Sequence, residues 1–426
     1  MQEYDAIVVG GGPSGSACAS LLSAQGLRVL LLEKERFPRD KPCGDAIGGK
    51  ALNVLFELGL EGKLKGMGFQ RSAGLVFSSP NGNEVEIPLA QSGESSTGGY
   101  VCKRLDFDNI LFENAKKTCE VMEGAEVSEV IFEGEPQGKG DGRGRAVGVK
   151  VRLQGKVAGA GGRADAREEL QEFRAKVVVG ADGANSVVAR AAGVHRILPK
   201  HFCTAIRGYY KGIDGLRGNV EIHFLPECMP GYFWIFPLSE NEANAGVGML
   251  LSDITGRKLN LNKVLQECLQ NPKIAPRFGG ACLDGKIMGW SLPLASARRK
   301  CAGNGWVLLG DAASLIDPFS GEGIGNGMKS AKIASSVLGR ALKQRGKVEE
   351  GDCLEYENEL WKEIGADVDT SYKMQQLGSH SWLLNFIIGK AQKSGWLRGE
   401  LAAMIASREA KRKATDPLFY LRVLLS

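Results

Sequence analysis

The sequence lacks the patterns that mark metal-binding, secreted and membrane-spanning proteins. Its ten cysteines include no Cys-x-x-Cys pair and no Cys/His spacing typical of metal ligands, so we expect no structural zinc, no iron–sulfur cluster and no other metal site. No apolar stretch approaches the roughly 20 residues that cross a bilayer. The first apolar run, which begins at Tyr4, has the pattern of a strand and not of a signal peptide. These absences predict a cytoplasmic protein with free thiols that is soluble or lies peripherally on a membrane surface.

Strong charge of either sign is also missing. The 426 residues carry a formal net charge of only +5, and we expect no nucleic-acid partner. A late basic cluster, Arg408 with Lys411, Arg412 and Lys413, could face anionic lipid, but a solvated helix surface is its expected role. A chain of this length is long for one hydrophobic core, so two or three domains are expected.

The N-terminal segment has the pattern of a βαβ unit. Residues 4–9 predict a strand, residues 17–25 a helix, and residues 29–32 a second strand that ends at Glu33. Both strands are apolar without alternation, which is typical of a parallel sheet covered on both faces.

The turn between the first strand and the helix matches the pattern G-x-G-x-x-G. The first glycine permits a tight turn, the second lets the backbone approach a pyrophosphate, and the third allows the helix to pack closely on the strand. The phosphates then lie at the helix N-terminus. Glu33 follows the last glycine by 18 residues, where an acid can bind ribose, so FAD or NAD is expected rather than NADP. The cofactor-binding residues predicted here are Gly10, Gly12, Pro13, Ser14, Gly15 and Glu33.

Two later strand–turn–helix segments carry an acid and glycines at the end of a strand. Asp182 and Gly183 follow the apolar run 177–179, and Asp311 follows the run 306–309, with Gly321 and Gly323 shortly after. Each alone could be a helix with an N-capping Asp. Three such sites on one chain indicate one extended dinucleotide that several strands contact.

An aromatic run bounded by prolines suggests the substrate site. Tyr232, Trp234, Phe236 and Pro237 lie in the sequence Gly-Tyr-Phe-Trp-Ile-Phe-Pro-Leu, which predicts one wall of an apolar pocket. The alternative is a plain hydrophobic strand in a sheet core, since aromatic residues favour strands for packing reasons alone.

Together these motifs resemble those of the flavoprotein monooxygenase superfamily typified by para-hydroxybenzoate hydroxylase, over about residues 1–345. Within it, the loop Lys41-Pro42-Cys43-Gly44-Asp45 and the pattern Tyr-x-Trp-x-Phe-Pro resemble the geranylgeranyl reductase branch. The aromatic run departs from that of the related flavin halogenases, which looks like Trp-x-Trp-x-Ile-Pro.

The resemblance implies FAD as the cofactor and an α/β and α+β fold. Its parts would be a Rossmann-like FAD-binding domain (a parallel sheet plus a β-meander), an antiparallel-sheet substrate domain and a C-terminal helical region. The implied boundaries are 1–60, 101–195 and 296–345 for FAD binding, 61–100 and 196–295 for the substrate, and 346–426 for the helices. Further implied FAD contacts are Cys43, Gly44, Asp45, Arg104, Val127, Asp182, Gly183, Asp311, Gly321, Gly323 and Ile324. For Arg104 the alternative is a surface ion pair.

The resemblance also implies a reaction, the hydrogenation of isolated double bonds in a geranylgeranyl chain by hydride from flavin N5. An isolated alkene has no carbonyl group that could stabilise charge. The protein must therefore align the substrate and keep the site free of water. We expect Tyr232 and Trp234 to stabilise carbocation character through their ring faces. Cys43, or a water that it orients, is the candidate proton source.

Two other readings stay open from the sequence. An aromatic monooxygenase or halogenase could use the same scaffold with oxygen, and a non-catalytic prenyl-binding escort could use it without chemistry. The escort fits less well because the phosphate-binding glycines are all present.

The expected partners are an isoprenoid lipid or prenyl diphosphate and an electron donor, which could be NAD(P)H, ferredoxin or a deazaflavin. A long apolar substrate also requires contact with a membrane or lipid carrier. Residues 382–388, with Lys390 and Lys393, could form an interfacial helix; the alternative is a helix packed on the FAD-binding domain.

Overall fold

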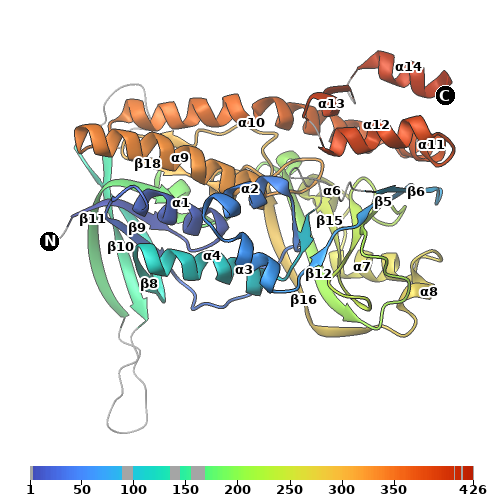
Figure 1. Ribbon diagram of the computed structural model, residues 1–426, viewed down its shortest axis with the longest axis horizontal. Helices are drawn as coiled ribbons and strands as arrows, with labels where there is room; N and C mark the ends of the chain where they lie inside the picture. Colours follow the sequence, from blue (N-terminus) through green and yellow to red (C-terminus); the bar gives the residue numbers. More distant parts are fainter. Residues whose placement is uncertain are drawn as a thin grey trace, which may run out of the picture.

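The structure, a computed structural model, describes residues 3–88, 99–134, 144–154, 168–406, 408–413 and 416–425. It contains two large sheets that lie end to end, with long helices along one side and a group of C-terminal helices at the far end (Figure 1).

The first sheet is the one that the βαβ pattern predicts. Its central strands run in the order β17-β18-β11-β1-β2-β8, and the pairings of β1 with β2 and β11, of β2 with β8, and of β11 with β18 are parallel. The long strand β11 also starts an antiparallel meander with β10 and β9. The strands are β1 (Glu3–Val9), β2 (Val29–Glu33), β8 (Glu120–Glu123), β9 (Ala125–Glu133), β10 (Arg145–Gln154), β11 (Glu168–Gly180), β17 (Ala302–Gly303) and β18 (Trp306–Leu308).

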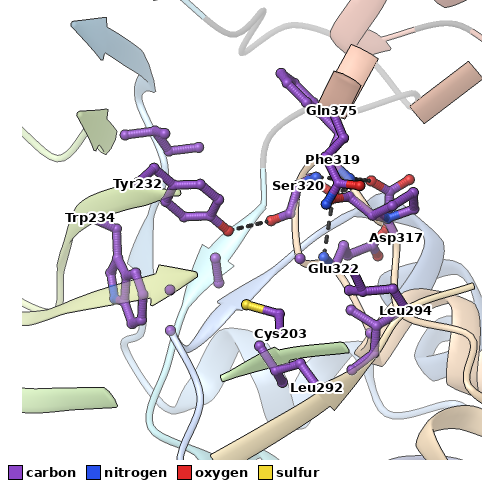
Figure 2. A pocket seen from close by; sticks show the side chains of 18 of the residues that line it. Cys203, Tyr232, Trp234, Leu292, Leu294, Asp317, Phe319, Ser320, Glu322 and Gln375 are labelled. Carbon is purple, nitrogen blue, oxygen red and sulfur yellow. Dashed lines mark hydrogen bonds between the residues drawn. The ribbon is translucent and has the colours of Figure 1, made fainter. Parts of the chain in front are cut away.

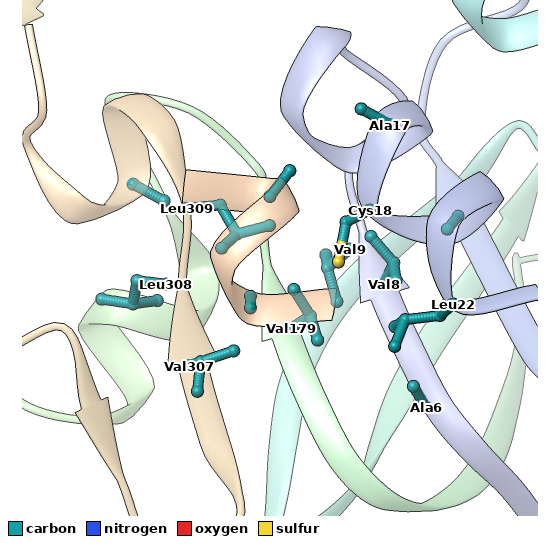
Figure 3. Packing of buried hydrophobic residues seen from close by; sticks show 14 of the residues in the cluster. Ala6, Val8, Val9, Ala17, Cys18, Leu22, Val179, Val307, Leu308 and Leu309 are labelled. Atoms are coloured by element: carbon teal, nitrogen blue, oxygen red, sulfur yellow. The ribbon is translucent and has the colours of Figure 1, made fainter. Parts of the chain in front are cut away.

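Helices cover this sheet because its strands are apolar on both faces. Helix α1 begins with Pro13 at its first position, packs against α4 and α9, and α10 packs on α9. Figure 3 shows the side chains of α1 over those of β1 and the neighbouring strands, including Cys18 against Val8 and Val9. The helices around this sheet are α1 (Pro13–Ser23), α2 (Gly49–Glu57), α3 (Glu61–Gly66), α4 (Arg104–Thr118), α5 (Val187–Ala191), the short 3₁₀ turn η2 (Gly310–Ala313), α9 (Ile324–Arg345) and α10 (Glu350–Gly378).

The second sheet has the order β16-β12-β15-β14-β13-β5-β6. Its neighbours pair antiparallel, as predicted, except that β13 and β5 pair parallel. The exception arises because the β5–β6 hairpin comes from an early part of the chain and joins the sheet beside β13 without a hairpin turn to fix its direction. The strands are β5 (Gly74–Ser78), β6 (Glu84–Pro88), β12 (Phe202–Lys211), β13 (Val220–His223), β14 (Tyr232–Pro237), β15 (Glu242–Leu250) and β16 (Cys282–Pro293).

Smaller elements connect and flank the two sheets. A three-stranded sheet, β3-β7-β4, lies at the connection, and short helices pack beside β12 and β15. These elements are β3 (Ala46–Ile47), β4 (Gln70–Arg71), β7 (Tyr100–Val101), η1 (Pro199–His201), α6 (Leu251–Gly256), α7 (Leu261–Gln270) and α8 (Ala275–Phe278).

The C-terminal helices share a hydrophobic cluster with the second sheet. Val85 and Ile87 of β6 pack with Leu384, Ile388 and Phe419, and the first sheet and the body of the second each have a cluster of their own. The helices are α11 (Ser381–Lys393), α12 (Gly395–Ala406), α13 (Arg408–Arg412) and α14 (Pro417–Leu425). Across the ranges described above, no helix is both long enough and apolar enough to cross a bilayer.

Candidate functional site

The glycine-rich turn after β1 is built so that one glycine faces free space and two are packed against backbone. A Cβ at Gly10 would lie 2.5 Å from the carbonyl oxygen of Ala181, and one at Gly15 would lie 1.8 Å from that of Gly10. A Cβ at Gly12 would meet only the Arg39 guanidinium, at 3.6 Å. The open side of Gly12, at the N-terminus of α1, is therefore where a pyrophosphate can approach the backbone.

Glu33 is held beside this turn. Its buried carboxylate accepts hydrogen bonds from the backbone N–H of Gly11 at 2.7 Å and from that of Glu35 at 2.8 Å. The acid is thus fixed at the end of β2, next to the glycine turn but outside the cavity lining, and its role in ribose binding stays a prediction.

Arg104 lies in the interior of the protein. It is 4% exposed, and its Nε and Nη2 both donate to the carboxylate of Asp108, with Nη2 at 2.6 Å. Arg39 donates to the same carboxylate. Burial alone would raise the pKa of Asp108, but Arg104 and Arg39 hold that pKa below its ordinary value. The alternative of a surface ion pair for Arg104 is therefore wrong, and its side chain borders the cavity described below.

The other predicted acids at strand ends differ in what they do. Asp182 caps α5, because its carboxylate accepts from Ser186 Oγ and from the Val187 N–H, both at 2.6 Å. Its neighbour Gly183, which has a φ of +77°, lines the cavity instead. Asp311 also lines the cavity, where its carboxylate accepts from Lys41 Nζ at 3.1 Å.

Most of the remaining predicted cofactor residues lie around the same space. Those that line the cavity are Pro13, Ser14, Gly12, Cys43, Gly44, Asp45, Gly321, Gly323 and Ile324. Val127 is buried in β9 and is absent from the lining. Its assignment as a contact stays a prediction.

The loop that carries Cys43 is pressed against the aromatic run. A Cβ at Gly44 would lie 2.8 Å from the ring of Phe236 and 3.6 Å from Trp234 Nε1. The amide of Asn244 donates to the Cys43 carbonyl oxygen at 2.7 Å. Desolvation raises the pKa of the Cys43 thiol, so the thiol stays protonated at neutral pH.

The aromatic run forms a wall of the cavity along β14. The rings of Tyr232 and Trp234 are 6.2 Å apart at 64°, and those of Trp234 and Phe236 are 6.1 Å apart at 41°. Trp234 Nε1 donates to Asn244 Oδ1 at 2.9 Å. Figure 2 shows the Tyr232 hydroxyl directed toward Ser320, to whose carbonyl oxygen it donates at 2.9 Å. Tyr232, Trp234 and Phe236 line the cavity, whereas Pro237 is buried at the end of β14, outside the lining.

A single cavity of about 1280 Å³ joins these parts. It extends from the glycine turn and Asp311 to an apolar chamber between β14 and the C-terminal helices. The chamber's apolar lining includes Leu75, Phe77, Val85, Ile87, Val220, Ile222, Phe224, Met249, Leu292 and Leu294 from the second sheet and its flanks, and Leu384, Ile387, Ile388, Leu401, Met404 and Phe419 from the C-terminal helices.

The role of the C-terminal helices in the cavity was missed by the sequence reasoning. Leu383, Leu384 and Ile388 of α11 are buried, and Trp382 is 68% exposed. The helix is packed, as the alternative expected, but its partner is β6 of the second sheet and not the FAD-binding domain. The apolar stripe of α11 was a signal, but the sequence could not say that it faces a cavity.

Two more features were missed. Gly246, paired with Trp234 across β14 and β15, has no room for a side chain, since a Cβ would lie 2.4 Å from the indole. Lys411 lies against Ser371, with Nζ to Oγ at 2.5 Å, and 3.5 Å from the carboxylate of Asp317. The expectation of a solvated role is therefore wrong for Lys411, because a buried carboxylate needs a cation nearby.

Buried polar groups at the junction of the two sheets are suited to bind a polar ligand. Asp45 Oδ1, Arg207 Nε and Trp290 Nε1 are buried with no hydrogen-bond partner in the described part of the chain, and all three residues line the cavity. Native proteins rarely leave such groups unpaired. A dinucleotide fits the glycine turn and Glu33, and the unpaired donors of Arg207 and Trp290 suit a polar ring system at this junction. The described residues contain no group of three or more His, Cys, Asp or Glu side chains able to hold a metal ion.

Comparison with known proteins agrees with this geometry. Residues 3–206 match the family model described as an FAD binding domain. The chain is 31% identical over 378 residues to the digeranylgeranylglycerophospholipid reductase of Methanocella arvoryzae, covering 88% of this chain and 87% of the relative. It is also 31% identical to the menaquinone reductase of Mycobacterium tuberculosis, covering 78% and 76% of the two chains.

Solved structures share the architecture. A geranylgeranyl bacteriochlorophyll reductase-like protein from Thermoplasma acidophilum has a TM-score of 0.81 at 24% identity, with 100% of this chain and 98% of the other covered. The myxobacterial chondrochloren halogenase has a TM-score of 0.70 at 26% identity, with 87% and 82% covered. The first likeness concerns the fold alone, and the second shows that the scaffold also serves halogenation.

Proposed function

Because this chain belongs to the geranylgeranyl reductase family of FAD-dependent oxidoreductases, we propose that it saturates isolated double bonds in the geranylgeranyl chains of a lipid. A digeranylgeranyl glycerophospholipid is the proposed substrate, since the similar Methanocella protein is named for that lipid. The finer choice among phospholipid, diphosphate and quinone tail is decided by the experiment below.

One observation carries the proposal: the nucleotide-binding turn and the apolar chamber are two ends of one cavity. Its volume of about 1280 Å³ exceeds the roughly 300–1,000 Å³ of ordinary small-molecule sites. That space suits a dinucleotide together with a long hydrocarbon chain. The chain would lie against the aromatic wall and under the C-terminal helices.

The residues of the site align the substrate, exclude water and stabilise the charge that develops on the alkene. When bound and reduced, the flavin supplies the hydride. Tyr232 and Trp234 present their rings to the cavity, where a ring face can stabilise developing positive charge on the alkene by cation–π attraction. The apolar lining excludes water, which strengthens that attraction.

The monooxygenase or halogenase reading is less favoured. Its support is the shared scaffold of the chondrochloren halogenase. Against it stand the family of the chain and the aromatic run, in which Tyr232 and Phe236 replace the Trp and Ile of the halogenase pattern.

We further propose that the protein meets the membrane through the outer side of α11 and α14. Trp382, Leu418 and Leu424 are exposed there, at 68%, 65% and 59%. The two helices are in contact, since Lys390 Nζ of α11 donates a hydrogen bond to the Leu424 carbonyl oxygen of α14. Exposed apolar side chains beside cations are typical of a surface that binds anionic lipid headgroups.

An anaerobic assay tests the proposed function. The flavin of the purified protein is reduced chemically, which removes the need to know whether NAD(P)H, ferredoxin or a deazaflavin is the donor. Digeranylgeranyl glycerophospholipid, geranylgeranyl diphosphate or menaquinone is then added in separate arms. We expect flavin reoxidation with a mass gain of two per double bond, fastest for the phospholipid. Product that forms only in air would overturn the proposal in favour of a monooxygenase.

A further inference from the structure

Asp45 stands out among the carboxylates of the cavity wall. It is completely buried, and its backbone has a φ of +70°, a conformation that residues other than glycine seldom adopt. The loop and its neighbours therefore hold a carboxyl group where burial disfavours its charged form.

The two oxygens of Asp45 have different surroundings. Oδ2 accepts from the Tyr209 hydroxyl and from the Asn244 amide, both at 2.8 Å. Oδ1 is buried with no hydrogen-bond partner among the described residues, and Asp45 lines the cavity. Oδ1 is therefore the atom that can bind a water or ligand group from the cavity.

Asn244 also connects Asp45 to the aromatic wall. It donates to Asp45 through the same nitrogen that bonds the Cys43 carbonyl oxygen, and its oxygen accepts from Trp234. Asp45 thus lies one hydrogen-bonded residue from the indole that borders the substrate space.

Tyr209 leads away from the cavity. It is half-buried and is absent from the cavity lining. The Arg207 guanidinium lies over its ring at 4.2 Å and Lys103 Nζ at 4.8 Å, and Lys103 pairs with Glu242, which is partly exposed. The Tyr209 hydroxyl thus contacts Asp45, whereas the face of its ring borders a group of charged side chains.

On the basis of the proposed function, we propose that Asp45 holds the proton that alkene reduction consumes, with Tyr209 and Asn244 positioning the carboxyl group through Oδ2. In each turnover the carbon–carbon π bond breaks, one carbon receives hydride from the reduced flavin, and the other receives the Asp45 proton. The flavin loses two electrons, which its reductant replaces. Asp45 is left as a carboxylate, and its Oδ1 takes a proton from water before the next turnover.

The electrostatic surroundings agree with this role. Burial raises the pKa of Asp45 to about 6, although hydrogen bonds from Asn244 and Tyr209 and the charges of Arg207 and Arg104 act in the other direction. An acid with that pKa is partly protonated near neutral pH and gives up its proton readily. The Cys43 thiol, whose pKa is raised by desolvation, is a much poorer donor.

The experiment compares the wild type with Asp45→Asn and Tyr209→Phe in single-turnover alkene reduction by the chemically reduced holoenzyme, as a function of pH. We expect the wild-type rate to fall as pH rises through about 6, which gives the pH–rate profile a descending limb. Asp45→Asn should be slower by 10²-fold or more, and its profile should lack this limb. Tyr209→Phe removes a hydrogen bond to the carboxylate, so the limb should move to higher pH. Asp284→Asn, a surface acid paired with Lys211, and Tyr210→Phe, the neighbouring tyrosine in a separate core, are the matched controls.

Infrared difference spectra of the oxidised holoenzyme give a readout that needs no substrate. A carbonyl band of a protonated carboxyl group should disappear between pH 5 and pH 8 in the wild type and be missing in Asp45→Asn. The inference is overturned if that band is the same in both, or if Asp45→Asn keeps the wild-type pH limb. If Asp45→Asn fails to retain FAD, an unshifted limb in Tyr209→Phe overturns it. If the wild type reduces no prenyl lipid, the proposed function fails, and the infrared titration still decides whether Asp45 stores a proton.

Discussion

The Tyr232 hydroxyl donates a hydrogen bond to the carbonyl oxygen of Ser320 across 88 residues of sequence (Figure 2). This bond joins the aromatic strand β14 to the turn that carries Gly321 and Gly323. This hydrogen bond therefore links the aromatic wall of the cavity to the turn that is proposed to bind the cofactor.

Replacement of Tyr232 by Phe should weaken FAD binding while leaving the wall in place. The variant loses one hydrogen bond, of a kind that contributes about 0.5–1.5 kcal/mol, so the dissociation constant of FAD should rise by about 2- to 12-fold. A fluorescence titration of the apoprotein with FAD measures this dissociation constant. Tyr210→Phe is the control, since Tyr210 packs against Phe278 in the other core. Equal FAD affinity in both variants would contradict the connection.

Substitution of the glycines in the N-terminal turn should separate folding from cofactor binding. Gly12→Val adds a side chain whose Cβ meets no protein atom closer than the Arg39 guanidinium, so thermal stability of the apoprotein should be preserved while FAD affinity falls by more than about tenfold. Gly15→Ala places a methyl group against the Gly10 carbonyl and should lower the melting temperature itself. Calorimetry of the apoproteins and FAD titration distinguish the two. A Gly12→Val protein that binds FAD normally would refute the placement of the pyrophosphate.

Asp45→Asn should change how stability depends on pH. Because the pKa of Asp45 is raised by burial to about 6 in the folded protein, its favourable contribution is present below the unfolded value near 3.8 and is lost as pH rises to about 6. The variant lacks this titration. We expect its free energy of unfolding to decline less between pH 4 and pH 7, by at most about 3 kcal/mol relative to the wild type. Urea unfolding across that range measures the difference, and parallel curves would argue against a raised pKa.

Lys411→Met should destabilise the protein at neutral pH. Burial alone would raise the pKa of Asp317, but Lys411, the Ser320 N–H and Ser371 together lower it. A carboxylate with a lowered pKa contributes stability above its unfolded value near 4, and that contribution is lost on acidification through the lowered pKa. Removal of the cation should therefore cost about 2 kcal/mol or more at pH 7 and less below pH 4. Lys413→Met, which breaks an exposed pair with Glu400, should cost under about 1 kcal/mol.

Elements made of neighbouring residues could be read from the sequence. The strand pair 4–9 and 29–32, the glycine turn and the aromatic strand follow from local periodicity and turn chemistry, and they lie where these patterns predict. The likeness of the Cys43 loop to a known branch also needed nothing beyond order along the chain.

The partners of single side chains could not be read in this way. Asn244 reaches Asp45 over 199 residues, and Lys411 reaches Asp317 over 94. Nothing in the local pattern distinguishes these from solvated polar residues. The C-terminal helices that line the cavity are a similar case, because an apolar stripe on α11 suits a membrane surface as well as a protein interior.

The sequence by itself thus determined the type of sheet, the nucleotide-binding turn and the family, because each depends on the order and spacing of nearby residues. Only the tertiary structure decided that the turn and the apolar chamber form one cavity, that C-terminal helices line it, and that a buried carboxyl group lies in its wall. Burial and hydrogen bonding between distant segments are properties of the packed chain, and they set the charge state and the contacts on which the chemistry depends.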